Sequence, residues 1–253
     1  MFFSKPGMYS PCRMYSIGHI ILFTITFISI ILLLQIFKKS NKDTVKKIIK
    51  IATISLWILE IIKIIFNLII GNIRNPNHYI PLYYCSLILY AGLLSSFAKG
   101  NLKKIGDVFI STGAIVGGTF FLCCPNTSLT MYPMFHYISI QSFIFHGTMV
   151  YLGILVNITD YVDLKITDIK YYAILVSIVS FISYIINGIL GTNFMFISKN
   201  FPNTPVDILY KATGKFFTSV MILIQILGPF YVMYLIIHII KRRGLKNKII
   251  EQI

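Results

Sequence analysis

The stretch SIGHIILFTITFISIILLLQIF, residues 16–37, decides the fold class of this chain because it contains no Asp, Glu, Lys or Arg. About 20 apolar residues in a helix cross the hydrocarbon core of a bilayer, which is about 30 Å thick. The apolar region of a secretory signal peptide is shorter, about 7–15 residues. Lys38 and Lys39 follow the stretch where small cleavage-site residues would be needed. The stretch therefore predicts an uncleaved membrane-spanning helix.

Six further apolar runs of similar length follow, and the segments between them are short and polar. The seven predicted spans are about 16–37, 50–70, 79–98, 106–124, 134–156, 171–191 and 216–240. The runs are continuous rather than alternating, which favours helices over the strands of a membrane barrel. The whole chain is 56% hydrophobic and 12% charged, whereas a soluble domain has about 25% charged residues. We therefore expect an all-α, multi-pass protein of the cell membrane, with residues 1–253 forming one polytopic domain.

The positive charge of the chain is distributed as membrane topology requires. The formal net charge is +15, but Lys and Arg gather in short segments between apolar runs, so nucleic-acid binding is not expected. Alternate flanks of the predicted spans hold 16 and 6 of the 23 basic residues, and Lys63 lies inside a span: the richer flanks are 38–50, 99–104, 165–170 and 241–248. By the positive-inside rule, the N-terminus is expected outside and the C-terminus in the cytoplasm.

The four cysteines do not predict a metal site. Cys12, Cys85, Cys123 and Cys124 show no CxxC spacing and no Cys/His ligand pattern, so no metal is expected. Gly113, four residues before Gly117, is typical of close helix packing in membranes. The sequence leaves open whether the chain forms a homo-oligomer.

Polar residues inside the predicted spans are candidates for function, because burying them in a membrane is costly. Glu60 and Lys63 are three residues apart on one helix face, and form either a mutually neutralised pair or part of a proton relay. His146 lies in the middle of the fifth span, with Gln141 and His136 nearer its outer end. His146 is either a hydrogen-bonded structural residue or a general base. Cys85 is either an inert small side chain or a nucleophile.

Three motifs together resemble the YwaF family of bacterial integral membrane proteins, from about the second span to the last. They are Pro81-Leu82-Tyr83-Tyr84-Cys85, then Gln141 to Gly147 after Tyr132-Pro133 and His136, and finally Gly191-Thr192-Asn193-Phe194-Met195-Phe196 with Pro202 and Pro205 after it. The family is similar to animal multi-span phospholipid acyltransferases that are proposed to use a Cys and a His. This chain departs from the family pattern at Tyr83, where the family usually has His.

The resemblance implies lipid acyl transfer, with Cys85 as nucleophile and His146 as base. Asn193 or Gln141 would donate a hydrogen bond to the developing oxyanion, membrane lipids would be the partners, and no cofactor would be needed. If both spans were helical from their outer boundaries, Cys85 would lie about 9 Å and His146 about 18 Å deep. Two alternatives remain: a transporter or small-molecule-binding protein with a polar cavity, and a membrane scaffold without chemistry.

Overall fold

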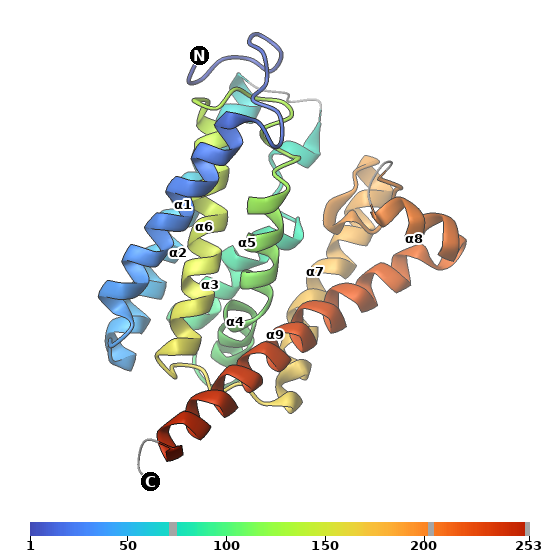
Figure 1. Cartoon of the computed structure of the whole chain (residues 1–253). Helices are drawn as coiled ribbons and strands as arrows, with labels where there is room; N and C mark the ends of the chain where they lie inside the picture. The colour runs from blue at the N-terminus through green and yellow to red at the C-terminus, as the bar shows by residue number, and fades with distance from the viewer. Residues whose placement is uncertain (71–74, 202–204, 251–253) are drawn as a thin grey trace.

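The computed structural model describes residues 1–70, 75–201 and 205–250, and within these ranges the chain is helical with no strand. The side chains of residues 205 and 243–250 are not described. The helices, shown in Figure 1, are α1 (Ile17–Phe37), α2 (Lys42–Ile69), α3 (Leu87–Phe97), α4 (Gly100–Ser111), α5 (Gly113–Cys123), α6 (Tyr137–Ile158), α7 (Ile169–Leu190), α8 (Pro205–Thr213) and α9 (Phe217–Ile250). Short 3-10 turns are η1 (Pro76–His78), η2 (Tyr84–Ser86), η3 (Ile166–Asp168), η4 (Phe194–Phe196) and η5 (Gly214–Phe216).

The predicted all-α membrane class is confirmed. Five helical segments in the described chain are long and apolar enough to cross a membrane: Ile17–Phe37, Gly100–Cys123, Tyr137–Ile158, Ile166–Leu190 and Val206–Arg242. The other two predicted spans correspond to α2, which carries Glu60 and Lys63, and to α3, which has 11 residues. The N-terminal segment and the end of α9 lie at opposite ends of the bundle (Figure 1).

Helix α6 forms the centre of the main bundle. It packs against α1, α2, α4 and α5, and most of its residues are buried on all sides. Helix α1, in contrast, buries only His19 and Ile30. Its exposed face is almost entirely apolar, so it is suited to contact lipid rather than water. Helices α7 and α9 pack against each other beside this bundle (Figure 1).

The third and fourth predicted spans differ from the observed helices. The third was expected over 79–98, but helix α3 begins only at Leu87, after the turns η1 and η2. Pro81 accounts for the first part of this delay, because proline has no N–H and disfavours helical geometry in the residue before it, and Tyr83, whose backbone is extended, accounts for the rest. The fourth, expected over 106–124, is interrupted at Thr112, whose φ of −128° and ψ of −77° separate α4 from α5.

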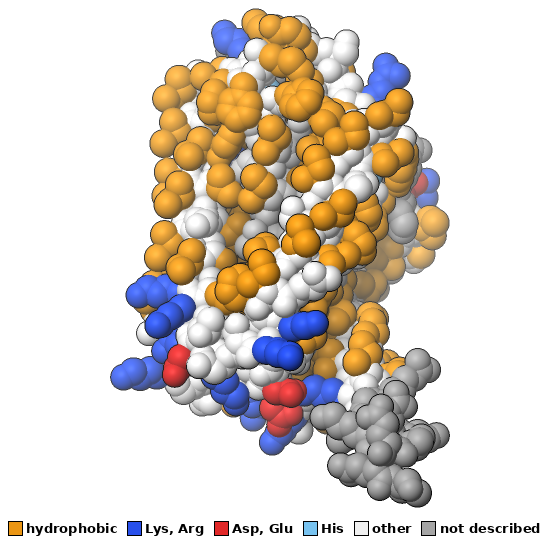
Figure 2. Space-filling view, turned by 60° about the vertical axis from the view of Figure 1, so that its left-hand side comes forward, with side chains coloured by type: hydrophobic (Ala, Val, Ile, Leu, Met, Phe, Trp, Pro, Cys, Tyr) orange, Lys and Arg blue, Asp and Glu red, His pale blue; other side chains and the backbone are white. Residues whose placement is uncertain are grey.

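The space-filling view supports a membrane environment. Apolar side chains cover most of the height of the face shown in Figure 2, while Lys and Arg side chains gather at its lower end. An uninterrupted apolar belt bounded by charge is what a lipid-facing surface requires. The unequal charge at the two ends agrees with the unequal flanks in the sequence.

Glycines in α5 bring its backbone very close to neighbouring helices. A Cβ atom on Gly118 would lie 2.7 Å from the carbonyl oxygen of His146 in α6, and one on Gly113 would lie 2.7 Å from the hydroxyl of Tyr172 in α7. At Gly118 such a distance excludes any side chain unless a backbone moves, and at Gly113 the neighbouring side chains would have to shift. The small-residue pattern of α5 therefore sets the position of α6 and of His146.

We expect Gly118→Ala to destabilise the protein, because overpacking of this kind costs about 1–3 kcal/mol. Gly188→Ala is the matched control, since a Cβ there would have no atom within 4 Å. It should leave stability unchanged or raise it, because Ala favours a helix over Gly by about 1 kcal/mol. Thermal unfolding in detergent measures both. Equal unfolding midpoints for the two variants would contradict the close approach.

Candidate functional site

Five of the seven candidate residues line one cavity of about 400 Å³, a volume within the range of about 300–1,000 Å³ typical of ligand pockets. These five are Cys85, Gln141, His146, Glu60 and Lys63. The walls come from α2, the segment with η1 and η2, α5, α6 and the η4 loop. Residues separated by up to about half of the sequence therefore meet at one hollow between helices.

Cys85 reaches the cavity because the chain before it is not helical. Tyr83 is extended, with φ of −81° and ψ of 159°, and Cys85 lies in the turn η2. An extended chain advances about 3.3 Å per residue, compared with 1.5 Å in a helix. The depth expected from a continuous helix over 79–98 was therefore wrong for Cys85, and the cavity includes both Cys85 and His146. The Cys85 thiol donates to the carbonyl oxygen of Gly117, at 3.9 Å.

The ring of His146 is fixed on two sides. It stacks on Phe121, with ring centroids 3.6 Å apart and planes at 10°, and Nδ1 donates to the carbonyl oxygen of Ser142 at 2.7 Å. Because a carbonyl can only accept, Nδ1 carries the proton and Nε2 carries the lone pair. In the described part of the chain, Nε2 has no hydrogen-bond partner and Cys85 is not hydrogen-bonded to it. His146 is therefore oriented as a free proton acceptor beside the cavity.

Gln141 supplies amide donors to the same cavity. Its side chain is 3% exposed, and its oxygen accepts a weak hydrogen bond from the Ser142 hydroxyl at 3.5 Å. No described group accepts from its two N–H donors. A buried amide with unused donors is a candidate for binding a carbonyl or an oxyanion.

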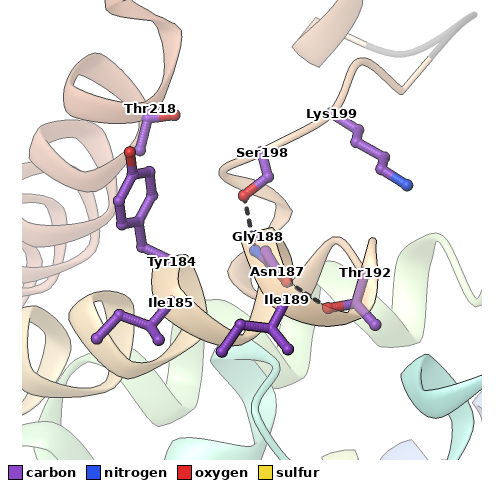
Figure 3. A pocket seen from close by; sticks show the side chains of 9 residues that line it. All are labelled: Tyr184, Ile185, Asn187, Gly188, Ile189, Thr192, Ser198, Lys199 and Thr218. Atoms are coloured by element: carbon purple, nitrogen blue, oxygen red, sulfur yellow. Dashed lines mark hydrogen bonds between the residues drawn. The ribbon is translucent and has the colours of Figure 1, made fainter.

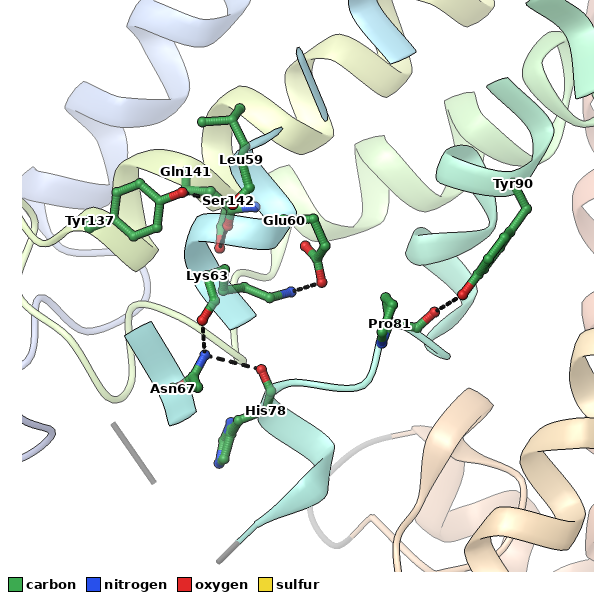
Figure 4. Close-up of polar contacts among 10 residues, drawn as sticks. All are labelled: Leu59, Glu60, Lys63, Asn67, His78, Pro81, Tyr90, Tyr137, Gln141 and Ser142. Atoms are coloured by element: carbon green, nitrogen blue, oxygen red, sulfur yellow. Dashed lines mark hydrogen bonds and ion pairs between the residues drawn. The ribbon is translucent and has the colours of Figure 1, made fainter. Parts of the chain in front are cut away.

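The predicted pair of Glu60 and Lys63 forms in the cavity wall, with Nζ 2.6 Å from Oε1 (Figure 4). Glu60 is 1% exposed. Asn67 connects the end of α2 to η1, because its Nδ2 donates to the carbonyl oxygen of Lys63 at 2.9 Å and to that of His78 at 3.1 Å.

Sequence reasoning missed His78, which lines the cavity from η1. Burial lowers the pKa of His78 below its ordinary value, and the positive charge of Lys63 lowers it further. The signal for this position was slight, since His78 lies in a loop, next to Asn75-Pro76-Asn77. Only the return of that loop over α2 brings it to the site.

Asn193 and His136 do not line this cavity. The Asn193 side chain is used within its own loop: Oδ1 accepts from the N–H groups of Ser198 and Lys199, both at 3.0 Å, and Nδ2 donates to the Lys199 carbonyl at 3.3 Å. His136 caps α6, with Nδ1 accepting from Ile138 N–H and Nε2 donating to the Ser4 carbonyl, both at 3.1 Å. His136 therefore anchors the N-terminal segment to the N-terminal end of α6. Pro202 of the third motif, with Asn203 and Thr204 after it, lies outside the described residues.

A second, more open hollow of about 510 Å³ lies between α7, the η4 loop and the start of α9 (Figure 3). Asn187 organises this region, because its Oδ1 accepts from Thr192 and from Phe194 N–H, both at 2.7 Å, and its Nδ2 donates to Ser198 at 2.7 Å. These bonds hold the Gly-Thr-Asn-Phe-Met-Phe loop. Met195 and Phe196 both adopt left-handed backbone geometry there, with φ of 55° and 54°.

All four cysteines are free thiols. In the described residues, no group of three or more His, Cys, Asp or Glu side chains lies in a position to hold a metal ion. The polar groups that line the cavity are hydrogen-bond donors, hydrogen-bond acceptors and one ion pair. Such groups can bind a ligand and transfer protons.

The apolar helices and the polar cavity between them define a multi-pass helical membrane protein. A family model described as the TMEM164 family matches residues 14–240, and the chain belongs to that family. No curated protein and no solved structure gives a significant match. The match establishes a family of multi-span membrane proteins and leaves the YwaF resemblance and the acyltransferase activity as predictions.

The buried cap at His136 predicts a pH dependence of stability. Burial lowers the pKa of His136 below its ordinary value of 6.5, so the unfolded chain binds this proton at a higher pH than the folded protein. Stability from this group is present above pH 6.5 and is lost as the pH falls through that value towards the folded pKa. Thermal unfolding between about pH 7.5 and about pH 5 measures it.

The control is His136→Asn, which retains a good helix-capping side chain but cannot titrate. Its unfolding midpoint should fall less on acidification than that of the unsubstituted protein. Burial also lowers the pKa of His78. His78 is present in both proteins, so its contribution to the pH dependence cancels in the comparison. The same decrease in both would show that His136 does not sense pH.

Proposed function

We propose that this protein is a lipid acyltransferase that uses Cys85 as nucleophile and His146 as general base. The observation that carries the proposal is that both residues line one cavity, with His146 Nε2 free to accept a proton. The resemblance of the Cys, His and Asn motifs to the YwaF family gives independent support. No cofactor is required for the chemistry, because acyl transfer between oxygen esters needs no oxidant or activated carrier.

In the first step, the Cys85 thiol gives its proton to His146 Nε2, and the sulfur attacks the ester carbonyl carbon of a phospholipid. A C–S bond forms and the carbonyl oxygen becomes an oxyanion. Collapse of this intermediate breaks the ester C–O bond, and the leaving oxygen takes the proton from His146. The products are an acyl thioester on Cys85 and a lysophospholipid. In the absence of a direct hydrogen bond, the proton passes through one water or after the two side chains approach on substrate binding.

In the second step, the hydroxyl of a different lysolipid gives its proton to His146 and attacks the thioester. The C–S bond breaks, the new ester forms, and the proton returns to the Cys85 sulfur. Splitting the transfer in this way replaces one difficult step by two easier ones. Gln141 supports the oxyanion in both steps, because its unused N–H donors face the same cavity. Asn193 is less suited to that role, since its amide is already occupied in the loop.

We further propose that α2 and α3 cross the membrane with the five long apolar segments, which gives seven spans in the cell membrane with the N-terminus outside. Opposite positions of the two ends of the chain require an odd number of crossings (Figure 1). The Lys and Arg side chains at the lower end in Figure 2 favour a cytoplasmic location for that end. In this orientation, the cavity lies nearer the outer surface.

Transport is the second candidate, favoured by the presence of Glu60 and Lys63 in the cavity wall. Buried charges in spans often mark ion or proton pathways. The two candidate functions predict different effects of substituting Cys85 and Glu60. Acyl transfer requires Cys85, whereas transport tolerates Cys85→Ser and is lost in Glu60→Gln.

The first experiment is to trap the acyl thioester. Purified protein is incubated with a phospholipid labelled in its acyl chain and analysed by mass spectrometry. We expect a hydroxylamine-labile adduct on Cys85 that is absent in Cys85→Ala and strongly reduced in His146→Ala. Cys124→Ala is the matched control, because Cys124 is a second thiol that lines the cavity, and it should retain the adduct. An adduct on Cys124 instead, or none in folded protein across several lipid classes, would exclude the mechanism.

A substitution of Gln141 tests whether its amide stabilises the oxyanion. Gln141→Leu removes both amide donors while keeping the approximate size of the side chain. We expect the rate of thioester formation to fall about 100- to 1,000-fold, the usual effect of losing one oxyanion donor. Asn193→Leu serves as the comparison and should lower stability more than the rate. An unchanged rate in Gln141→Leu, in protein with an unchanged unfolding midpoint, would remove Gln141 from the mechanism.

A further inference from the structure

The cavity that contains Cys85 opens sideways, towards the lipid-facing surface. Phe120, near the outer end of α5, lines the cavity although 70% of the residue is exposed. A side chain that both lines a cavity and is largely exposed stands at its rim. Because Phe120 belongs to the membrane-spanning segment Gly100–Cys123, the surface at this rim is apolar and faces lipid rather than water.

Phe196 of η4 also lines the cavity. Figure 1 shows why a gap exists here: the upper part of α5 and the end of α7 that leads to η4 diverge, whereas α9 crosses below and packs against both helices. The side chains of α5 and of the η4 loop then line a single hollow between them.

Phe196 is held at the rim by a strained backbone. Its φ of 54° follows a φ of 55° at Met195, and such left-handed geometry is unfavourable for both residues. Gln225 of α9 donates to the Met195 carbonyl at 2.6 Å, and the Tyr83 ring packs on Phe196 with centroids 5.2 Å apart. Strained residues that the surroundings hold in place cluster at ligand-binding sites. The strain here directs an aromatic side chain to the cavity.

The lining combines aromatic and polar side chains, as an amphipathic ligand requires. Phe120, Phe121, Phe145 and Phe196 are among the aromatic ones, and the loops and the end of α2 contribute these polar ones: Lys63, Asn67, Asn77, His78, Asn126 and Thr127. The volume of about 400 Å³ is too small for a lipid with two long chains. The rest of such a ligand must remain outside, and the opening at Phe120 leads to the bilayer.

We propose that an acyl chain of a bilayer phospholipid enters the cavity sideways between Phe120 and Phe196, with its headgroup against the polar side chains around Lys63. The inference rests on the proposed function for the chemistry at Cys85, but it concerns binding and gives the route by which the phospholipid reaches the thiol. The second chain of the lipid stays in the membrane during the reaction.

Photolabelling of Cys85→Ser protein in phosphatidylcholine vesicles tests this binding without the chemistry. The probe is a phosphatidylcholine with a diazirine in one acyl chain, and labelled residues are mapped by mass spectrometry. We expect label on Phe121 and Phe145, which are buried and line the cavity. Phe143 is the control on the same helix as Phe145, because it is equally buried but does not line the cavity. Label on Phe143 equal to that on Phe145 would overturn the proposal.

The rim is tested by a bulkier side chain. Phe120→Trp narrows the opening and should lower labelling of Phe121 and Phe145 several-fold. Phe181→Trp is matched, because Phe181 is an apolar residue of α7 with 66% exposure that does not line the cavity, and it should change nothing. Unfolding midpoints confirm that both variants are folded. Labelling that is the same in both variants would overturn the sideways route.

The two proposals fail separately. Cavity labelling that depends on Phe120, without a thioester on Cys85 in the unsubstituted protein, would support lipid binding and reject acyl transfer. A thioester that forms only from a water-soluble acyl thioester, without cavity labelling by phosphatidylcholine, would reject the sideways route and leave acyl transfer intact.

Discussion

The close backbone contact between α5 and α6 is the constraint on which the site depends. Gly118 allows the His146 carbonyl to approach to a distance that no other residue would permit. The neighbouring Gly117 exposes the carbonyl oxygen that accepts from the Cys85 thiol. Phe121, one turn along α5, then lies flat against the His146 ring. One helix contact thus places the thiol acceptor, the ring and its stacking partner together, and a wider separation would disperse all three.

The fold class could be predicted from sequence because a membrane imposes a simple length and composition rule. Residues 16–37 contain no charge and became α1, and the central run around His146 became α6. The rule fails where the backbone conformation is set by something other than hydropathy. At 79–86, Pro81 disfavours helical geometry in the residue before it and Tyr83 is extended, so a run of suitable composition begins as turns. At Thr112 a run of continuous hydropathy contains a backbone break that composition does not reveal.

The candidate site was predictable to the extent that function resides in polar residues within apolar runs. His146 and Glu60 were identifiable in this way, because each is costly to bury without a purpose, whereas Cys85 was identified by the resemblance of its motif. Their common cavity was not, since the depth of Cys85 depends on an extended segment and not on helical rise. His78 reaches the site only through hydrogen bonds that return its loop to α2. Asn193 stands out in the sequence because it lies in a motif. In the structure, its side-chain amide makes three hydrogen bonds within its own loop.

The ion pair of Glu60 and Lys63 links these observations. A buried pair rarely stabilises a fold, because removing two charges from water costs several kcal/mol per ion and the attraction returns little more. The cost is greater beside lipid, where no water compensates. A pair that served packing alone would be replaceable by apolar side chains of similar volume. Its position in the wall of the cavity, with the Lys63 ammonium partly exposed and Glu60 buried behind it, instead turns the positive end of a neutralised pair towards the hollow. In the proposed lipid complex, a headgroup phosphate is the complement of that positive end, which gives a buried pair a role in binding.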